Sequence, residues 1–229
     1  MAPDSGGPVD FIFMMTRDDR TVGDCLSVFD EVADLGVRHI GFKDVGVEPN
    51  VLEQLHRRIK DAGGTSYLEV VSLTPESTRR SAATARRIGV DRLLGGLEPV
   101  AVLEVIAGTA IEYFPFVGRP QGHPTSLLGS PEEIADDCRR ADELGCAGVD
   151  LLAYRALAAD PIDLVRGARA ALRGRLIVAG SISSPERVSA LASLGVDAFT
   201  IGTALFERRF AADQPSLREQ VKEALAAAA

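Results

Sequence analysis

The sequence has few cysteines, and none of them stands in a pattern that binds metal. Cys25, Cys138 and Cys146 form no CxxC pair and have no histidine nearby at metal-ligand spacing. Disulfide frameworks and zinc sites depend on such patterns, so we expect thiols that are buried or partly buried. We predict no metal and no other cofactor.

Basic residues are also in the minority, because 33 acidic residues face 25 basic ones and the formal net charge is −8. Nucleic acids and anionic membrane surfaces are bound mainly through a basic excess, so neither partner is expected. A local basic pocket for one small anion is still compatible with this charge.

Long apolar runs are missing too. None approaches the roughly 18 residues that cross a bilayer. Residues 1–8 lack the basic and apolar segments of a secretory signal, so we expect a disordered leader there and a cytoplasmic protein.

A recurring pattern indicates the architecture: a helix that ends in Leu-Gly or Ile-Gly, followed at once by a short apolar strand. The glycine suits the position after a helix, where a positive φ is needed. The apolar run suits a buried parallel strand. The pattern occurs at Gly36, Gly89, Gly145 and Gly195. Helix starts carry a capping residue before a proline at Thr74, Ser130, Asp160 and Ser184.

These signals predict eight strand–helix units. The expected strands are 9–17, 37–43, 66–72, 90–95, 111–117, 147–154, 175–181 and 197–202. The expected helices are 21–35, 49–62, 75–88, 98–108, 130–144, 160–172, 184–194 and 216–228. Eight such units within residues 9–229 predict a single (β/α)8 TIM-barrel domain. An open doubly wound sheet is the alternative, since it needs no eighth unit.

In a (β/α)8 barrel the chemistry takes place at the carboxyl ends of the strands. Strand alternation turns Lys43, Glu69, Arg92, Asp150 and Tyr154 toward the barrel interior. Two positive and two negative side chains in this set could form a purely structural ion-pair network. We favour a catalytic role, because Lys43 ends its strand and lysine can lose its proton and attack a carbonyl.

The seventh and eighth strands both end in glycine followed by a hydroxyl residue, Gly180-Ser181 and Gly202-Thr203. Glycine lets an anion approach backbone N–H groups, and the hydroxyl adds a donor. Loops after these two strands, with a short extra helix predicted at 204–210, form the usual phosphate site of such barrels. Two simple tight turns are the alternative.

Three further basic residues are candidate contacts for the substrate. Arg119 and His123 lie in the long loop 118–126, which is a candidate lid on the catalytic face, or else an ordinary surface loop. Arg17 ends the first strand. Arg92 is expected to lower the pKa of Lys43 as well as to contact substrate.

The paired Gly-Ser and Gly-Thr ends resemble the ribulose-phosphate-binding barrel superfamily, which includes the histidine-biosynthesis isomerases and ribulose-phosphate epimerase. The resemblance implies a (β/α)8 fold and a phosphorylated metabolite as partner. The histidine-pathway isomerases carry aspartates on their first and fifth strands, whereas strands 9–17 and 111–117 end without one. Barrels of this type often pair, which leaves a homodimer open.

Three functions follow from these residues. The first is a Schiff-base lyase or synthase of the aldolase type, which acts through Lys43 on a small phosphorylated carbonyl compound. Glu69 or Asp150 would move protons, and Tyr154 or His123 would serve as acid. The second is a metal-independent sugar-phosphate isomerase or epimerase, in which a protonated Lys43 stabilises an enolate. The third is a barrel that binds a phosphorylated ligand without catalysis.

Overall fold

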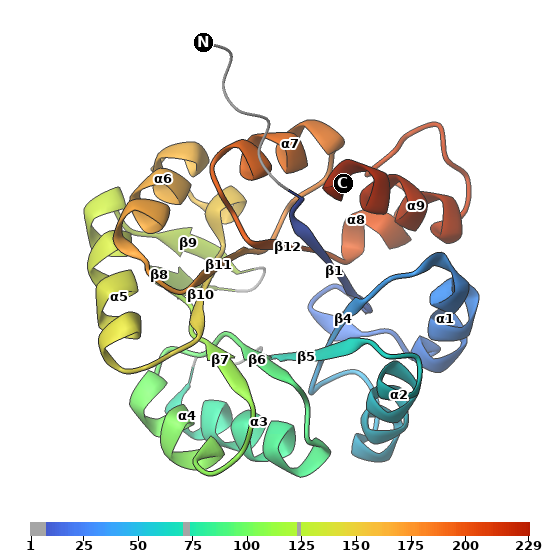
Figure 1. The fold of residues 1–229 in the computed structure, drawn as a ribbon, viewed down its shortest axis with the longest axis horizontal. Coiled ribbons are helices and arrows are strands. Elements are labelled where there is room, and N and C mark those ends of the chain that lie inside the picture. Colours follow the sequence, from blue (N-terminus) through green and yellow to red (C-terminus); the bar gives the residue numbers. More distant parts are fainter. Residues whose placement is uncertain (1–7, 71–73, 123–124) are drawn as a thin grey trace.

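Eight parallel strands form one sheet in the computed structural model, which describes residues 8–70, 74–122 and 125–229. The strands run around a ring in the order β10, β11, β12, β1, β4, β5, β6 and β7 (Figure 1). Their bounds are β1 Asp10–Met14, β4 His39–Lys43, β5 Thr65–Glu69, β6 Arg92–Leu94, β7 Glu112–Phe114, β10 Gly148–Leu151, β11 Arg175–Val178 and β12 Ala198–Ile201.

The ring closes between β7 and β10. The amide of Ala147 donates to the carbonyl of Tyr113 at 3.0 Å, and the amide of Asp150 donates to the carbonyl of Pro115 at 2.9 Å. An open sheet would leave these edges unpaired. The (β/α)8 barrel is therefore confirmed, and the doubly wound alternative is wrong.

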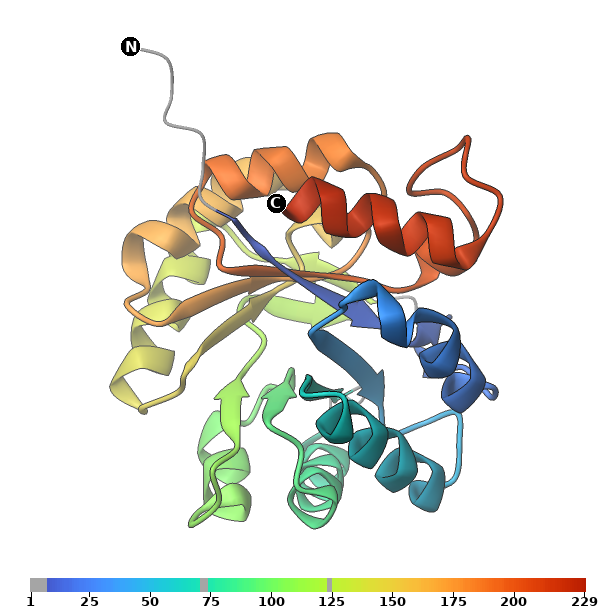
Figure 2. The same cartoon turned by 45° about the vertical axis from the view of Figure 1, so that its right-hand side comes forward.

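The helices form an outer layer around the strands (Figures 1 and 2). Several of them begin as the sequence predicts, with proline in the first turn, and Ser130 and Glu133 form a capping box. Their bounds are α1 Cys25–Val32, α2 Pro49–Asp61, α3 Pro75–Ile88, α4 Pro99–Ile106, α5 Pro131–Glu143, α6 Pro161–Ala171, α7 Pro185–Ser193, α8 Thr203–Phe206 and α9 Leu217–Ala228.

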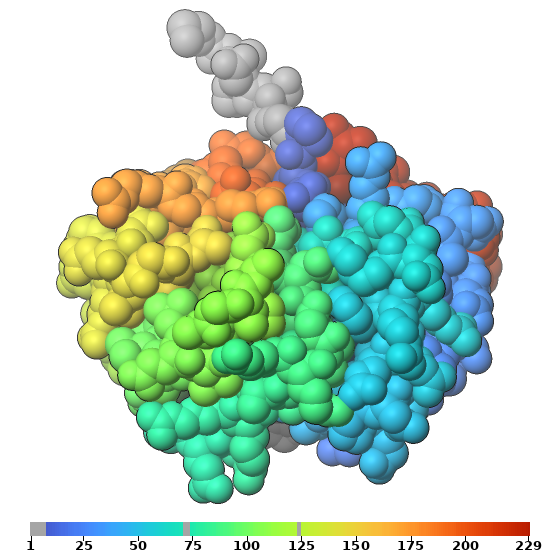
Figure 3. All heavy atoms as spheres, turned by 60° about the horizontal axis from the view of Figure 1, so that its bottom comes forward, coloured from blue at the N-terminus to red at the C-terminus, as the bar shows by residue number. Residues whose placement is uncertain are grey.

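The first and last segments of the barrel meet. The amide of Val9 donates to the carbonyl of Ala228 at 3.1 Å, and β1 pairs with β12. In the space-filling view the blue and red parts of the chain accordingly lie next to each other (Figure 3). Of the expected leader 1–8, only the exposed Pro8 belongs to the described residues.

Strand alternation divides the apolar residues into two clusters, as expected. Ile40, Phe42, Leu68 and Leu93 belong to the large cluster between the strands and the helices. A smaller cluster fills the barrel itself with Ile12, Met14, Tyr67, Leu94, Phe114, Ile177 and Ala198. All three cysteines are buried and free, as predicted.

The chain departs from the expected pattern at three loops on the carboxyl side. Residues 16–21, expected to end a strand and begin a helix, form a hairpin of β2 Thr16–Arg17 and β3 Arg20–Thr21. A second hairpin, β8 Arg119–Gln121 with β9 Ser126–Leu128, begins in the predicted lid loop and extends two residues beyond it. The strand expected over 147–154 ends at Leu151, and a 3-10 helix follows at Ala153–Arg155.

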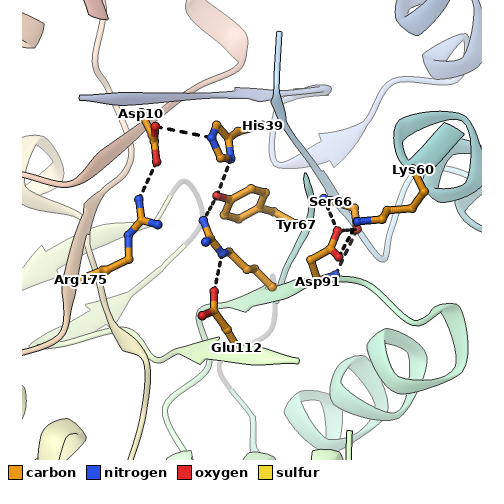
Figure 4. Close-up of polar contacts among 9 residues, drawn as sticks. Asp10, His39, Lys60, Ser66, Tyr67, Asp91, Glu112 and Arg175 are labelled. Atoms are coloured by element: carbon orange, nitrogen blue, oxygen red, sulfur yellow. Dashed lines mark hydrogen bonds and ion pairs between the residues drawn. The ribbon is translucent and has the colours of Figure 1, made fainter. Parts of the chain in front are cut away.

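Polar side chains close the amino-terminal end of the barrel (Figure 4). The hydroxyl of Tyr67 lies 2.9 Å from Nδ1 of His39 and accepts a hydrogen bond from Arg92. Nε2 of His39 lies 3.5 Å from Asp10, and Arg92 also pairs with Glu112 at 2.6 Å. These partners satisfy His39 and give it a structural role at this end of the barrel.

This network makes stability depend on pH. Burial lowers the pKa of His39, against the attraction of Asp10, and the charges of Arg92 and Arg175 lower it further. The unfolded chain therefore binds more protons than the folded one near pH 6.5, and stability falls as the pH drops through and below that value. In urea titrations between pH 5 and 8, the free energy of unfolding should fall with decreasing pH more steeply for wild type than for His39→Gln. The difference between the two slopes should be at most about 1.4 kcal/mol per pH unit. Equal slopes for both proteins would contradict this assignment.

Candidate active site

A cavity of about 500 Å³ opens at the carboxyl ends of the strands. Its wall is built from the β2–β3 hairpin, the ends of β4 and β5, the 3-10 helix and the loops that follow β11 and β12. The charged side chains in this wall are Asp18, Asp19, Lys43, Glu69, Arg155, Arg187, Glu207 and Arg209. The volume is in the range of small-molecule sites, so the cavity is the candidate active site.

Lys43 lies in this wall with its ammonium between two carboxylates. Its Nζ is 2.7 Å from Oδ1 of Asp19 and 3.3 Å from Oε1 of Glu69, and its side chain is only 6% exposed. Burial lowers the pKa of Lys43, but the two carboxylates outweigh burial and the pKa is raised above its ordinary value. The expected lowering of this pKa by Arg92 is therefore wrong, because Arg92 lies at the opposite end of its strand.

Asp19 was missed by the sequence analysis, because a hairpin brings it back over the barrel. Asp18 and Asp19 have φ values of 51° and 56°, as the two central residues of a type I′ turn require. Thr21 fixes the hairpin to β4: its hydroxyl donates to the carbonyl of Lys43 at 2.7 Å and accepts from the amide of Lys43 at 2.8 Å. An Asp-Asp pair between two short polar runs was the one local signal for this turn.

Arg155 lies between Asp19, the ion-pair partner of Lys43, and the loop after β11. Its Nη2 lies 3.6 Å from Oδ1 of Asp19, and Nη1 donates to the carbonyl of Thr125 at 3.4 Å. A Cβ at Gly180 would lie only 2.5 Å from Nε of Arg155. The glycine therefore lets the arginine pack against the loop backbone, a role that the sequence analysis did not foresee.

Asp150 points inward, as predicted, and is fully buried. Neither of its carboxyl oxygens has a hydrogen-bond partner among the described residues. Burial and the nearby charge of Glu69 raise the pKa of Asp150 well above its usual range, and Lys43 and Arg155 offset only part of this. The buried surroundings of Asp150 therefore favour its protonated form.

The two glycine loops lie side by side in the cavity wall. Gly180 and Ser181 have φ values of 78° and 57°, so both occupy the left-handed region. A Cβ at Gly202 would lie 2.7 Å from Oγ1 of Thr16, so this position has no room for a side chain. The sequence predicts a short extra helix over 204–210, and the observed α8 begins at Thr203 and ends at Phe206; its first N–H groups have no partner within the helix.

Five of the predicted residues with described positions do not line the cavity: Arg17, Arg92, Arg119, Asp150 and Tyr154. Arg17 is exposed on the hairpin, and Arg119 pairs with Glu133. Arg92 belongs to the amino-terminal network, because it is the first residue of its strand rather than the last. Tyr154 does not follow the strand alternation, since β10 has already ended, and it packs under Arg187. His123 lies outside the described residues.

The carboxylates that pair with Lys43 are Asp19 and Glu69, whereas the neighbouring Asp44 accepts a hydrogen bond from Ser81 at 2.5 Å.

Among the residues with described positions, no group of three or more His, Cys, Asp or Glu side chains is arranged to hold a metal ion. None of the described helices is long and apolar enough to cross a membrane.

No protein-family model and no curated protein matches the chain. Solved structures match nearly its whole length. Orotidine 5′-phosphate decarboxylase from Pyrococcus horikoshii OT3 is 17% identical, with a TM-score of 0.66 and coverage of 95% of this chain and 98% of the other. A mutant tryptophan synthase alpha-subunit from Pyrococcus furiosus is 14% identical, with a TM-score of 0.66 and coverage of 96% and 97%.

A third match is (S)-3-O-geranylgeranylglyceryl phosphate synthase from Thermoplasma acidophilum, solved with its substrate sn-glycerol-1-phosphate. It is 16% identical, with a TM-score of 0.63, and the alignment covers 96% of this chain and 93% of the other. Identities this low show a common fold. The fold that they share with this chain is the (β/α)8 barrel.

Proposed function

We propose that the protein is an enzyme that isomerises or epimerises a small phosphorylated carbonyl compound. The phosphate would be held by the backbone of Gly180, Ser181, Gly202 and Thr203, with the carbonyl group at Lys43. The ion-paired Lys43 within a cavity bordered by both glycine loops is the observation that carries this proposal. Two of the similar structures have phosphorylated substrates in their titles, in keeping with a phosphate site in this fold.

The protonation of Lys43 favours acid–base chemistry over imine formation. With its pKa raised by Glu69 and Asp19, the side chain is an ammonium at neutral pH and carries no free electron pair. An ammonium cannot attack a carbonyl, but it stabilises negative charge that develops on a carbonyl oxygen. The isomerase is therefore better supported than the Schiff-base lyase.

Glu69 is the proposed base. It would remove the proton from the carbon next to the carbonyl, and the C–H electron pair would form an enolate whose oxygen anion rests on the Lys43 ammonium. Return of the proton to the former carbonyl carbon gives an isomer, provided that the hydroxyl proton on the adjacent carbon moves to the enolate oxygen. Return of the proton to the opposite face of the original carbon gives an epimer. Asp150, whose pKa is raised by burial and by the nearby charge of Glu69, would supply or store a proton during this exchange.

Deuterium exchange tests the chemistry without knowledge of the natural substrate. We would incubate the protein in D₂O with a panel of aldose and ketose phosphates of three to six carbons. NMR should detect deuterium on the carbon next to the carbonyl of at least one compound, and Glu69→Gln should abolish it because the amide cannot accept the proton. Binding of these compounds without exchange by any of them would favour the non-catalytic ligand-binding barrel.

A further inference from the structure

We propose that Arg187, held on the ring of Tyr154, binds the phosphate group directly and makes the site selective for dianionic phosphate monoesters. This inference rests on the proposed function and names the residue that recognises the charge of the substrate. Neither residue belongs to the glycine loops from which the phosphate site was predicted.

The charges in the cavity wall single out Arg187. Lys43 and Arg155 are neutralised by Asp19 and Glu69, and Arg209 pairs with Glu207 at 2.6 Å. Arg187 lines the same cavity and forms no ion pair with any described residue. It is therefore a cation whose charge is still available to an anion in the cavity.

The position of Arg187 is fixed by its neighbours. Its Nη1 donates to the carbonyl of Ser181, whose backbone is left-handed. Its guanidinium carbon lies 4.6 Å from the ring centroid of Tyr154, which is within the range of a cation–π contact. The arginine is thus held beside the glycine loop after β11 before any ligand arrives, which reduces the entropy lost on binding.

The helix end beside Arg187 attracts negative charge, part of which Glu186 in the same turn already supplies. The capping position of α7 is Ser184, so Arg187 lies in the first helical turn. A helix N-terminus carries partial positive charge, and a cation there reduces stability unless a negative group lies nearby. A bound phosphate dianion would satisfy the arginine and the helix end together.

The chemistry of these groups defines the ligand. Arginine offers several N–H donors in a planar fork and suits a phosphate with two or three free oxygens. Its interaction with a dianion is stronger than with a monoanion, so affinity should rise as phosphate loses its second proton near pH 7. A terminal monoester meets this condition, whereas a diester or a carboxylate carries only one charge.

Inorganic phosphate is the probe for this inference. Calorimetry would measure its affinity at pH 5.5 and pH 8 for wild type, Arg187→Gln, Gly202→Ala and Arg166→Gln. Arg187→Gln keeps an N–H donor for the Ser181 carbonyl and loses the charge. Arg166 is an exposed arginine of α6 outside the cavity, so its variant controls for net charge.

We expect Arg187→Gln to bind phosphate about 10- to 100-fold more weakly at pH 8, the range of a charge-assisted hydrogen bond, and with little change at pH 5.5. Tyr154→Phe should keep the rise in phosphate affinity from pH 5.5 to pH 8, because the aromatic ring under Arg187 remains. Tyr154→Leu removes the ring and should reduce that rise. Arg166→Gln should behave as wild type.

Unchanged binding by Arg187→Gln, together with lost binding by Gly202→Ala, would overturn this inference and leave the proposed function intact. Equal losses at both pH values would also overturn it, because they would indicate support of the loop rather than recognition of charge. Failure of wild type to bind phosphate at either pH would instead remove the phosphate site on which the proposed function depends.

Discussion

Lys43→Met should lower kcat by about 10²- to 10³-fold with the substrate identified by deuterium exchange. This is the usual cost of removing one group that stabilises an oxyanion. Steady-state kinetics would measure it. Asp19 and Glu69 would lose their common partner, so the variant should also unfold at lower urea concentration. Circular dichroism at the assay temperature would separate lost folding from lost catalysis.

Lys43→Arg is the matched variant, because it keeps the positive charge between the two carboxylates. If Lys43 acts only through its positive charge, this variant should retain measurable turnover. Arginine cannot form an imine with a carbonyl substrate, so such turnover would not depend on an imine. Borohydride reduction of wild type with substrate should add no mass to the peptide that contains Lys43. A substrate adduct on that peptide, with complete loss of turnover in Lys43→Arg, would establish the Schiff-base mechanism instead.

Asp150→Val should make the protein more stable and less active. The wild-type carboxyl group is fully buried without a hydrogen-bond partner in the described structure, which costs about 1–3 kcal/mol. Valine removes the polar atoms, so the free energy of unfolding at pH 7 should rise by a similar amount. Turnover should fall by about 10²- to 10⁴-fold, the contribution of a positioned acid or base.

The pH dependence gives this prediction a clear sign. Because burial raises the folded pKa of Asp150, the folded chain keeps a proton that the unfolded chain releases above about pH 3.9. The stabilising effect of that proton is complete below pH 3.9 and is lost as the pH rises toward the folded pKa. The advantage of Asp150→Val should therefore grow with pH. A variant that is less stable than wild type and fully active would show that Asp150 has a packing role only.

The architecture could be predicted because its signals are local. A glycine after each helix, a proline at helix starts and short apolar runs recur along the chain, and each depends on a few adjacent residues. Strand alternation also placed Lys43, Glu69 and Asp150 correctly, because side chains alternate in any strand. The same rule gave the wrong direction for Tyr154, since the strand stops at Leu151 and the following 3-10 helix has a different period.

The charged partners of the site could not be predicted, because they come from loops that fold back over the barrel. Asp19 reaches Lys43 only through the turn between β2 and β3, and Arg155 reaches Asp19 from the opposite side of the ring. No pattern along the sequence encodes such distances. The direction of the Lys43 pKa shift depends on these partners, and in our proposal it favours an enolate over an imine mechanism.

The barrel carries ionic groups at both ends, and its interior keeps them apart. Asp10, His39 and Arg92 begin their strands, whereas Lys43 and Glu69 end theirs, and an apolar cluster fills the barrel between them. A five-residue strand spans about 13 Å at roughly 3.3 Å per residue, and no group of the amino-terminal network is among the main influences on the Lys43 pKa. Substitutions in the network at the amino-terminal end of the barrel could therefore raise thermal stability without changing the proposed reaction at the carboxyl-terminal end.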